Sequence, residues 1–135
     1  FRNKTDSIDF VRYSQLQYGY YFVVLLDRMQ AAVDAIKAGK SYTGPKLFIQ
    51  VMSDSNLTPQ LVMLGLGDAA KRRPPYLSTL LTELWVEDES EGKYAKFWVR
   101  MAYNGETQHI TPESNELISW GKFKEMLLAF APRQE

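Results

Sequence analysis

The chain has 135 residues, with 16 basic and 16 acidic side chains, one histidine and no cysteine. This length suits one domain with a modest core. The balanced charge gives no support to a nucleic-acid partner, and the lack of cysteine excludes disulfides and thiolate metal sites. No apolar stretch reaches the ~18 residues that a membrane-spanning helix needs. We therefore expect no nucleic-acid partner, no membrane span and no metal or other cofactor.

The first half of the chain predicts a lead-in and a long helix. The sequence begins with Phe1 rather than methionine, which predicts a processed or truncated product that lacks an upstream segment. Phe1–Val11 is polar and mixed, and it predicts an extended lead-in. Tyr18–Ala38 predicts a helix, because its apolar residues recur at steps of three and four, and Gly39 is a suitable stop. The residues of that apolar face are Phe22, Leu25, Leu26, Met29, Val33 and Ile36.

The stretch that follows holds the candidate site. Its apolar run predicts a buried strand over Lys46–Met52, covered on both faces as in a parallel or mixed α/β sheet. Thr58-Pro59 predicts the start of a helix that reaches about Ala70. In open α/β sheets, ligands bind beyond the carboxyl ends of strands. Asp54 therefore stands where a general acid or base, or a cation ligand, is expected; the alternative role for its carboxylate is a cap for the turn.

The second half predicts an antiparallel hairpin and a final helix. Leu80–Glu87 and Lys93–Tyr103 alternate in hydropathy around the acidic turn Asp88–Gly92, and Asn104-Gly105 is a second turn signal. Ser119–Phe130 predicts a helix that Ser119 caps. The strand residues expected on the buried face are Ala95, Phe97, Val99 and Met101, and those expected on the helix face are Trp120, Phe123, Leu127 and Phe130.

Few other residues offer chemistry. A serine–histidine–aspartate set is formally available from Ser53, His109 and either Asp54 or Asp68. The basic run Lys71-Arg72-Arg73 is interpreted as a solvated loop, with an anion site as the alternative. Asn3 and Asn56 each begin a glycosylation sequon.

Several stretches resemble, in order, the C-terminal part of the histidine acid phosphatases, which include the prostatic and lysosomal acid phosphatases and the phytases. In that family a strand ends in a His-Asp pair. A Pro-Pro-Tyr loop, a Thr-Glu-Leu-aromatic strand and a segment near Asn-Glu-Thr-Gln-His follow. The similarity covers Gly19 to Phe130. The matching stretches are Ser53-Asp54-Ser55-Asn56-Leu57, Pro74-Pro75-Tyr76, Leu81-Thr82-Glu83-Leu84-Trp85 and Glu106-Thr107-Gln108-His109.

The resemblance implies the C-terminal portion of a three-layer α/β/α domain with a mixed sheet, formed by residues 1–135 as a single unit that is incomplete on its own. It implies that Asp54 is the proton donor to the leaving group, and that Ser53 replaces the second, phosphate-holding histidine. Counting back without gaps from the Pro-Pro-Tyr loop places Ser55-Asn56 on the His-Asp pair instead. The family's nucleophile motif, Arg-His-Gly-x-Arg-x-Pro, has no counterpart in this sequence.

Two functions follow from the resemblance. Phosphoryl transfer through a phosphohistidine needs a nucleophile and a cationic clamp. The favoured function is therefore a degenerate phosphatase-like protein, non-catalytic in this chain, with a binding or structural role in a larger protein or assembly. The alternative is the C-terminal part of an active acid phosphatase that hydrolyses phosphomonoesters, with its nucleophile on a missing N-terminal segment. Either function implies a partner, which is the N-terminal part of the same domain or another protein chain.

The expected location also comes from the resemblance. The eukaryotic relatives are largely secretory, and sequons at Asn3 and Asn56 agree with that origin. We therefore expect a glycoprotein of the secretory pathway, lysosomal or extracellular.

Overall fold

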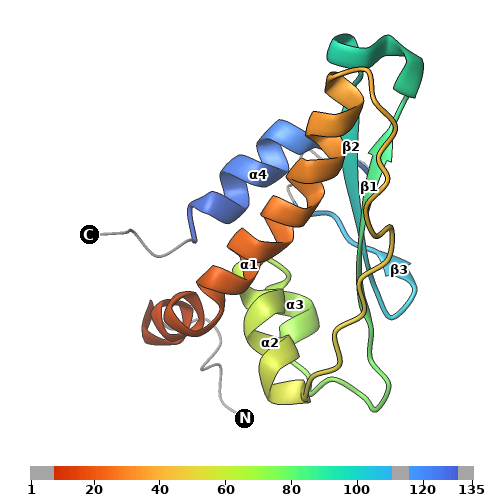
Figure 1. Cartoon of the computed structure of the whole chain (residues 1–135). Helices are drawn as coiled ribbons and strands as arrows, with labels where there is room; N and C mark the ends of the chain where they lie inside the picture. Colours follow the sequence, from red (N-terminus) through yellow and green to blue (C-terminus); the bar gives the residue numbers. More distant parts are fainter. Residues whose placement is uncertain (1–7, 111–115, 131–135) are drawn as a thin grey trace.

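A computed structural model of the chain describes residues 8–110 and 116–130. It contains helices and a sheet, so the predicted mixed α/β class is correct (Figure 1). The described strands pair antiparallel, with β2 joined to β1, β3 and β4. The elements are α1 (Ile8–Lys37), α2 (Asp54–Met63), α3 (Gly67–Ala70), β1 (Leu80–Val86), the 3-10 helix η2 (Glu89–Tyr94), β2 (Phe97–Tyr103), β3 (Glu106–Thr107), β4 (Ile118–Ser119) and α4 (Trp120–Leu128).

Helix α1 is longer than predicted. It begins at Ile8, so the extended lead-in expected up to Val11 is wrong for residues 8–11. Its predicted apolar face is confirmed, because all of those residues except the half-buried Leu25 are buried. Gly39 ends the helix as predicted. Its φ of 74° is in the left-handed region, and its N–H donates to the carbonyl of Ile36 (3.0 Å).

The predicted hairpin is confirmed, although its second strand begins at Phe97 rather than at Lys93, because Lys93 and Tyr94 belong to the 3-10 helix η2. β1 pairs with β2 from Leu80–Tyr103 to Val86–Phe97, and η2 forms most of the connection. The buried face of β2 is the predicted one, which places its apolar side chains in the core with α1 and α4. Asn104 and Gly105 both have positive φ, 50° and 83°, as the tight turn between β2 and β3 requires.

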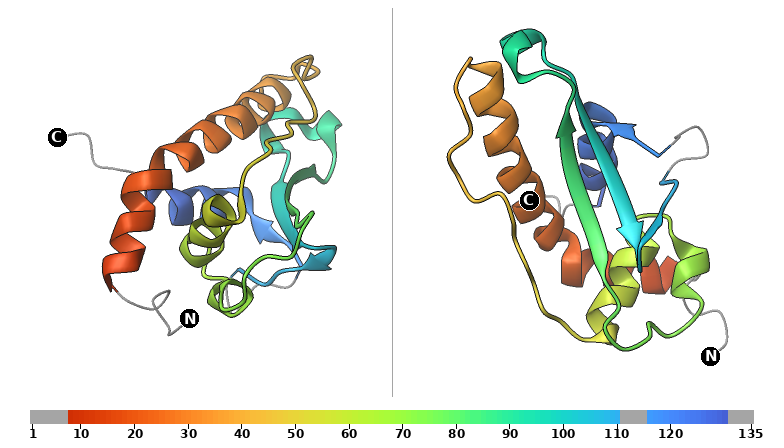
Figure 2. Two further views of the ribbon diagram at one scale, coloured as in Figure 1. Left: turned by 90° about the horizontal axis from the view of Figure 1, so that it is seen from below. Right: turned by 90° about the vertical axis from the view of Figure 1, so that its right-hand side faces the viewer.

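The last helix is also confirmed, although it ends at Leu128, so that Phe130 lies outside it and is half-buried. Ser119 is the N-cap of α4, and its hydroxyl accepts from the N–H of Lys122 (3.4 Å). Trp120, Phe123 and Leu127 are buried in the core. Together α1 and α4 cover one face of the sheet, while α2 and α3 lie at one end of the molecule (Figures 1 and 2). The short strands β3 and β4 were not predicted.

Residues 46–52, called the 46–52 segment below, contradict the prediction of a buried strand. They form no strand, and no backbone hydrogen bond joins them to another residue that the structure describes. Leu47, Ile49 and Val51 are 71%, 79% and 92% exposed. The segment is elongated and runs beside β1 at a distance, with α1 behind the space between them (Figure 2). The apolar run is present, but it lacks the neighbouring backbone that a strand needs.

The helix predicted from Pro59 to Ala70 is two helices, of which the first, α2, starts five residues earlier, at Asp54. Ser53, not Thr58, is the N-cap of α2, and Pro59 lies inside that helix. The hydroxyl of Thr58 donates instead to the carbonyl of Asp54 (3.1 Å). Gly65, with φ 74°, turns the chain between α2 and α3. The polar residues predicted as a turn thus form the first turn of a helix, in which Asp54 Oδ1 accepts from the N–H of Ser55 and Asn56 Oδ1 accepts from the N–H of the N-cap Ser53.

Candidate functional site

The predicted site residues Ser53 and Asp54 lie at the N-terminus of α2. Asp54 is the first residue of the helix, where a negative charge is favoured by the helix dipole. Its Oδ1 accepts from the N–H of Ser55 (2.9 Å). The carboxylate therefore helps to cap the helix, which is the alternative role given above for Asp54. The sequence predicted Asp54 in a turn between a strand and a helix that begins at Pro59, whereas the structure makes it the first residue of that helix, with no strand before it.

The second carboxylate oxygen of Asp54 is held by Arg73. The Nε of Arg73 lies 2.5 Å from Oδ2, in an ion pair whose side chains are 76% and 37% exposed for Arg73 and Asp54. The hydrogen bond from Arg73 holds the pKa of the Asp54 carboxyl below its ordinary value. A carboxyl in this state is ionised in mildly acidic solution, so it is a poor proton donor.

The side chain of Ser53 is hydrogen-bonded to neighbouring residues of the same turn. Its hydroxyl donates to Asn56 Oδ1 (2.7 Å), and it lies 2.7 Å from the hydroxyl of Ser55. The N–H of Ser53 also donates to Asn56 Oδ1 (3.1 Å). These bonds close the first turn of α2, and a serine in them offers no group that carries a positive charge toward a phosphate.

Asn56 connects this turn to α1. Its Nδ2 donates to the hydroxyl of Tyr18 (2.6 Å) across the interface of α1 and α2. This is the nitrogen that would carry a glycan, so glycosylation at Asn56 would have to replace a contact between two helices. Asn3, the other sequon asparagine, lies outside the described residues. Glycosylation at both positions stays a prediction.

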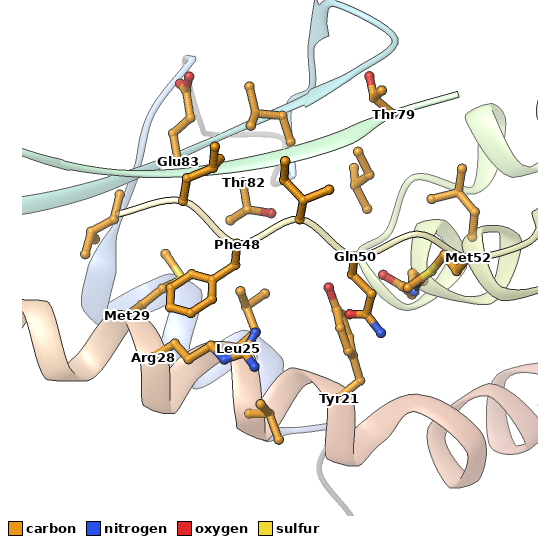
Figure 3. Close-up of a pocket in the computed structure, with 18 of the residues that line it drawn as sticks. Tyr21, Leu25, Arg28, Met29, Phe48, Gln50, Met52, Thr79, Thr82 and Glu83 are labelled. Atoms are coloured by element: carbon orange, nitrogen blue, oxygen red, sulfur yellow. Dashed lines mark hydrogen bonds between the residues drawn. The ribbon is translucent and has the colours of Figure 1, made fainter. Parts of the chain in front are cut away.

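Next to Asp54 opens a groove of about 2090 Å³. Its sides are the 46–52 segment and β1, and residues of α1 form its floor (Figure 3). Phe48 and Gln50 point from the segment toward α1, where Arg28 lies 4.4 Å from the centre of the Phe48 ring. Tyr21 also faces the groove, and its burial raises the pKa of the hydroxyl, which therefore stays neutral. Asp54 and Arg73 lie among the lining residues at the end where the segment enters α2.

The backbone of β1 turns one edge toward this groove. The N–H of Glu87 donates to Lys96, and the carbonyl of Thr79 accepts from Asn104, so odd-numbered residues of this strand face β2. In an antiparallel pair, consecutive residues face opposite edges. The N–H and C=O groups directed away from β2 are those of Leu80, Thr82, Leu84 and Val86. No backbone hydrogen bond to them from outside the β1–β2 ladder occurs among the described residues.

The remaining candidates do not gather at this site. His109 follows β3 and is not among the residues that line the groove containing Ser53 and Asp54. Asp68 pairs with Lys71 (2.7 Å) near α3. Within residues 8–110 and 116–130, no group of three histidine, aspartate or glutamate side chains is placed to hold a metal ion. The helices in these ranges also lack the combined length and apolar character that crossing a bilayer requires.

Sequence reasoning missed Arg73 and Tyr18. Arg73 belongs to the basic run that was interpreted as a solvated loop, and Tyr18 is the first residue of the helix predicted over Tyr18–Ala38. No local pattern identified the first contact, because it joins residues at the start of α2 and after the end of α3. Nothing in the sequence pointed to the second, because it depends on how α1 crosses α2.

Comparisons of the chain with known protein families, with curated proteins and with solved structures find no match.

Proposed function

We propose that this chain is a degenerate histidine acid phosphatase-like protein, without catalysis of its own, that serves in binding or in the structure of a larger protein or assembly. The observation that carries the proposal is an open groove next to an acidic side chain that is held by an arginine. Beside Asp54, whose carboxylate is bonded to Arg73, lie exposed apolar side chains and a strand edge that has no backbone partner among the described residues. Surfaces of this kind are typical of interaction sites.

The chemistry of the site supports the non-catalytic part of the proposal. A proton donor must be protonated before it acts, and the lowered pKa of Asp54 opposes this. Ser53, at the position of the family histidine, directs its hydroxyl into the first turn of α2. Neither residue supplies a nucleophile for a phosphohistidine intermediate. The fold proposed with this function is the C-terminal part of a three-layer domain whose mixed sheet is completed by a partner.

A second candidate is the enzyme whose nucleophile is on another segment. It is favoured by the location of the Asp54 carboxylate at one end of an open groove, where a phosphomonoester would have access. In this case Asp54 would be the general acid, and the groove would receive the remaining catalytic groups.

One assay separates the two functions. The complete protein is incubated with p-nitrophenyl phosphate at acid pH beside its Asp54→Asn variant, which keeps the shape but cannot donate the proton. We expect no turnover above that of the variant. Turnover by the complete protein that falls sharply in Asp54→Asn would overturn the proposal in favour of the enzyme. A mass measurement of the secreted protein checks the glycans predicted at Asn3 and Asn56.

A further inference from the structure

We propose that the groove between the 46–52 segment and β1 receives one extended polypeptide strand from a partner chain, which pairs with β1 and completes the sheet. The inference rests on the proposed binding function and adds where the partner binds, in which conformation and with what chemistry. Its occupant is an extended peptide with apolar side chains at alternate positions and no charge over its central residues.

The first support is the hydrogen-bonding edge. Leu80, Thr82, Leu84 and Val86 direct their backbone N–H and C=O groups toward the groove. An extended peptide satisfies such an edge along its length, which is the common mode of strand addition. A small ligand would leave most of these groups unpaired, and the groove of about 2090 Å³ is larger than the ~300–1,000 Å³ of small-molecule sites.

The second support is the apolar surface along both sides. From the segment, Leu47, Ile49 and Val51 are largely exposed, although their residue types are those that strands bury. On the floor, Leu25 and Met29 of α1 face the same space, and Thr82 points into it from β1 (Figure 3). Because side chains of a strand alternate, one face of the occupant lies on α1 and must be apolar.

The third support is charge. Within the central part of the groove, Arg28 lies over the ring of Phe48, and Glu83 pairs with Arg100 (3.1 Å) and points away. At the α2 end, Asp54 and Arg73 neutralise one another. Arg28 is the one charged side chain of this central part that has no ion pair among the described residues, and burying a further charged side chain there without a partner would be costly. An uncharged central stretch is the complement of such a surface.

The walls favour a single strand over a second copy of this chain. The 46–52 segment stands along the far side of the groove, so the edge of another folded sheet cannot reach β1 without displacing it (Figure 2). A stable dimer also needs about 800 Å² of buried surface from each partner.

The segment and β1 run in opposite directions, because the C-terminal end of the segment meets, through Asp54 and Arg73, the residues that precede β1. An inserted strand is therefore parallel to one wall and antiparallel to the other.

The test is hydrogen exchange measured by NMR on the full chain. The probe is a short peptide of alternating valine and threonine with a lysine at each end. Its control is the same peptide with N-methylated valines, which cannot donate along one edge. We expect the probe to slow exchange of the Leu80, Thr82, Leu84 and Val86 amides at least about tenfold, and the control peptide to leave them unchanged.

Variants of the chain sharpen the test. Ile49→Lys places a charge in the groove and should weaken binding of the probe at least about tenfold. The matched control is Leu16→Lys, because Leu16 is 74% exposed on α1 and does not line the groove. Thr82→Pro removes a groove-facing N–H and should weaken binding, whereas Thr82→Val keeps it. Circular dichroism establishes that each variant is folded.

Either of two results would overturn the inference. One is unchanged exchange at the groove-facing amides when the probe is present at its solubility limit. The other is protection of the same amides that grows with chain concentration and needs no peptide, which would assign the edge to a second copy. Phosphatase turnover is measured separately. A chain that binds the peptide and turns over substrate would refute the proposed function alone, and a chain that does neither would refute the inference alone.

Discussion

Strand β2 and the 46–52 segment are both seven residues long and both rich in apolar side chains, yet they differ in every structural respect. β2 is hydrogen-bonded to β1 on one edge and to β3 and β4 on the other, and Val99 and Met101 are fully buried. Within the part of the chain that the structure describes, the segment has no strand partner, and Val51 is almost fully exposed. It is held by side chains, with Phe48 against Arg28 and Met52 Sδ accepting from Gln60 (3.0 Å).

The comparison shows that an apolar run is not sufficient to form a strand, because a strand also needs a neighbouring backbone to pair with. Burial by α1 is available to both stretches, since residues of this helix contact the core under β2 and line the groove beside the segment. What differs is the presence of a neighbouring backbone. The N–H and C=O groups of a chain must be paired with protein or water, so an unpaired stretch keeps to the solvent even when its side chains are apolar.

The largest expected effect comes from placing a charge in each stretch. Val99→Asp buries a carboxylate without a partner and should lower the free energy of unfolding by more than about 4 kcal/mol. Val51→Asp places the same group in solvent and should change it by less than about 0.5 kcal/mol. Urea denaturation followed by circular dichroism measures both. Should Val99→Asp fail to fold, Val99→Ala should cost about 2 kcal/mol. Equal losses at the two valines would contradict the comparison.

A smaller effect distinguishes the two edges of β1. Glu83 faces β2, so Glu83→Pro removes a ladder hydrogen bond and leaves a carbonyl of β2 unpaired, at a cost of about 1–3 kcal/mol. Thr82 faces the groove, and Thr82→Pro removes an N–H that has no protein partner among the described residues. It should cost clearly less, as proline does on edge strands. Thermal unfolding compares the variants, and Glu83→Ala separates the loss of the Arg100 ion pair from that of the ladder. A larger loss from Thr82→Pro would reverse the assignment of the edges.

The same contrast explains which predictions from sequence succeeded. The β1–β2 hairpin, the Asn104-Gly105 turn and the Ser119 cap were predictable because both partners of each interaction are close in sequence. The face of α1 was predictable because helical spacing alone defines it. The strand at residues 46–52 was wrong because strand pairing depends on a remote backbone, and the apolar pattern carries no information about whether that backbone is present.

The candidate site divides in the same way. Ser53 and Asp54 were placed correctly beside a helix N-terminus by local signals, a short polar run before an apolar one. The start predicted from Thr58-Pro59 was wrong. The helix begins earlier because Ser53 and Asn56 form its first-turn hydrogen bonds, and Pro59 lies inside it. Arg73 could not be identified from spacing. Its contact with Asp54 joins the start of α2 to the residues after α3, and it depends on how these two helices fold back on one another.

The smallest expected effect concerns that contact, which ties the C-terminal end of the segment to the residues before β1. Because Arg73 lowers the pKa of Asp54, the pair stabilises the fold above the ordinary aspartate pKa of about 3.9, and this contribution is lost as pH falls through the lower, folded-state pKa. Arg73→Gln should therefore lower the Tm slightly at neutral pH and have no effect in strong acid. Arg72→Gln removes the same charge one residue away and serves as the control. Since the pair is exposed to solvent, added salt should shrink the difference at neutral pH. Identical Tm profiles for Arg72→Gln and Arg73→Gln between neutral and strongly acid pH would show that Asp54 does not hold this end of the segment, and that its side-chain contacts at Phe48 and Met52 suffice.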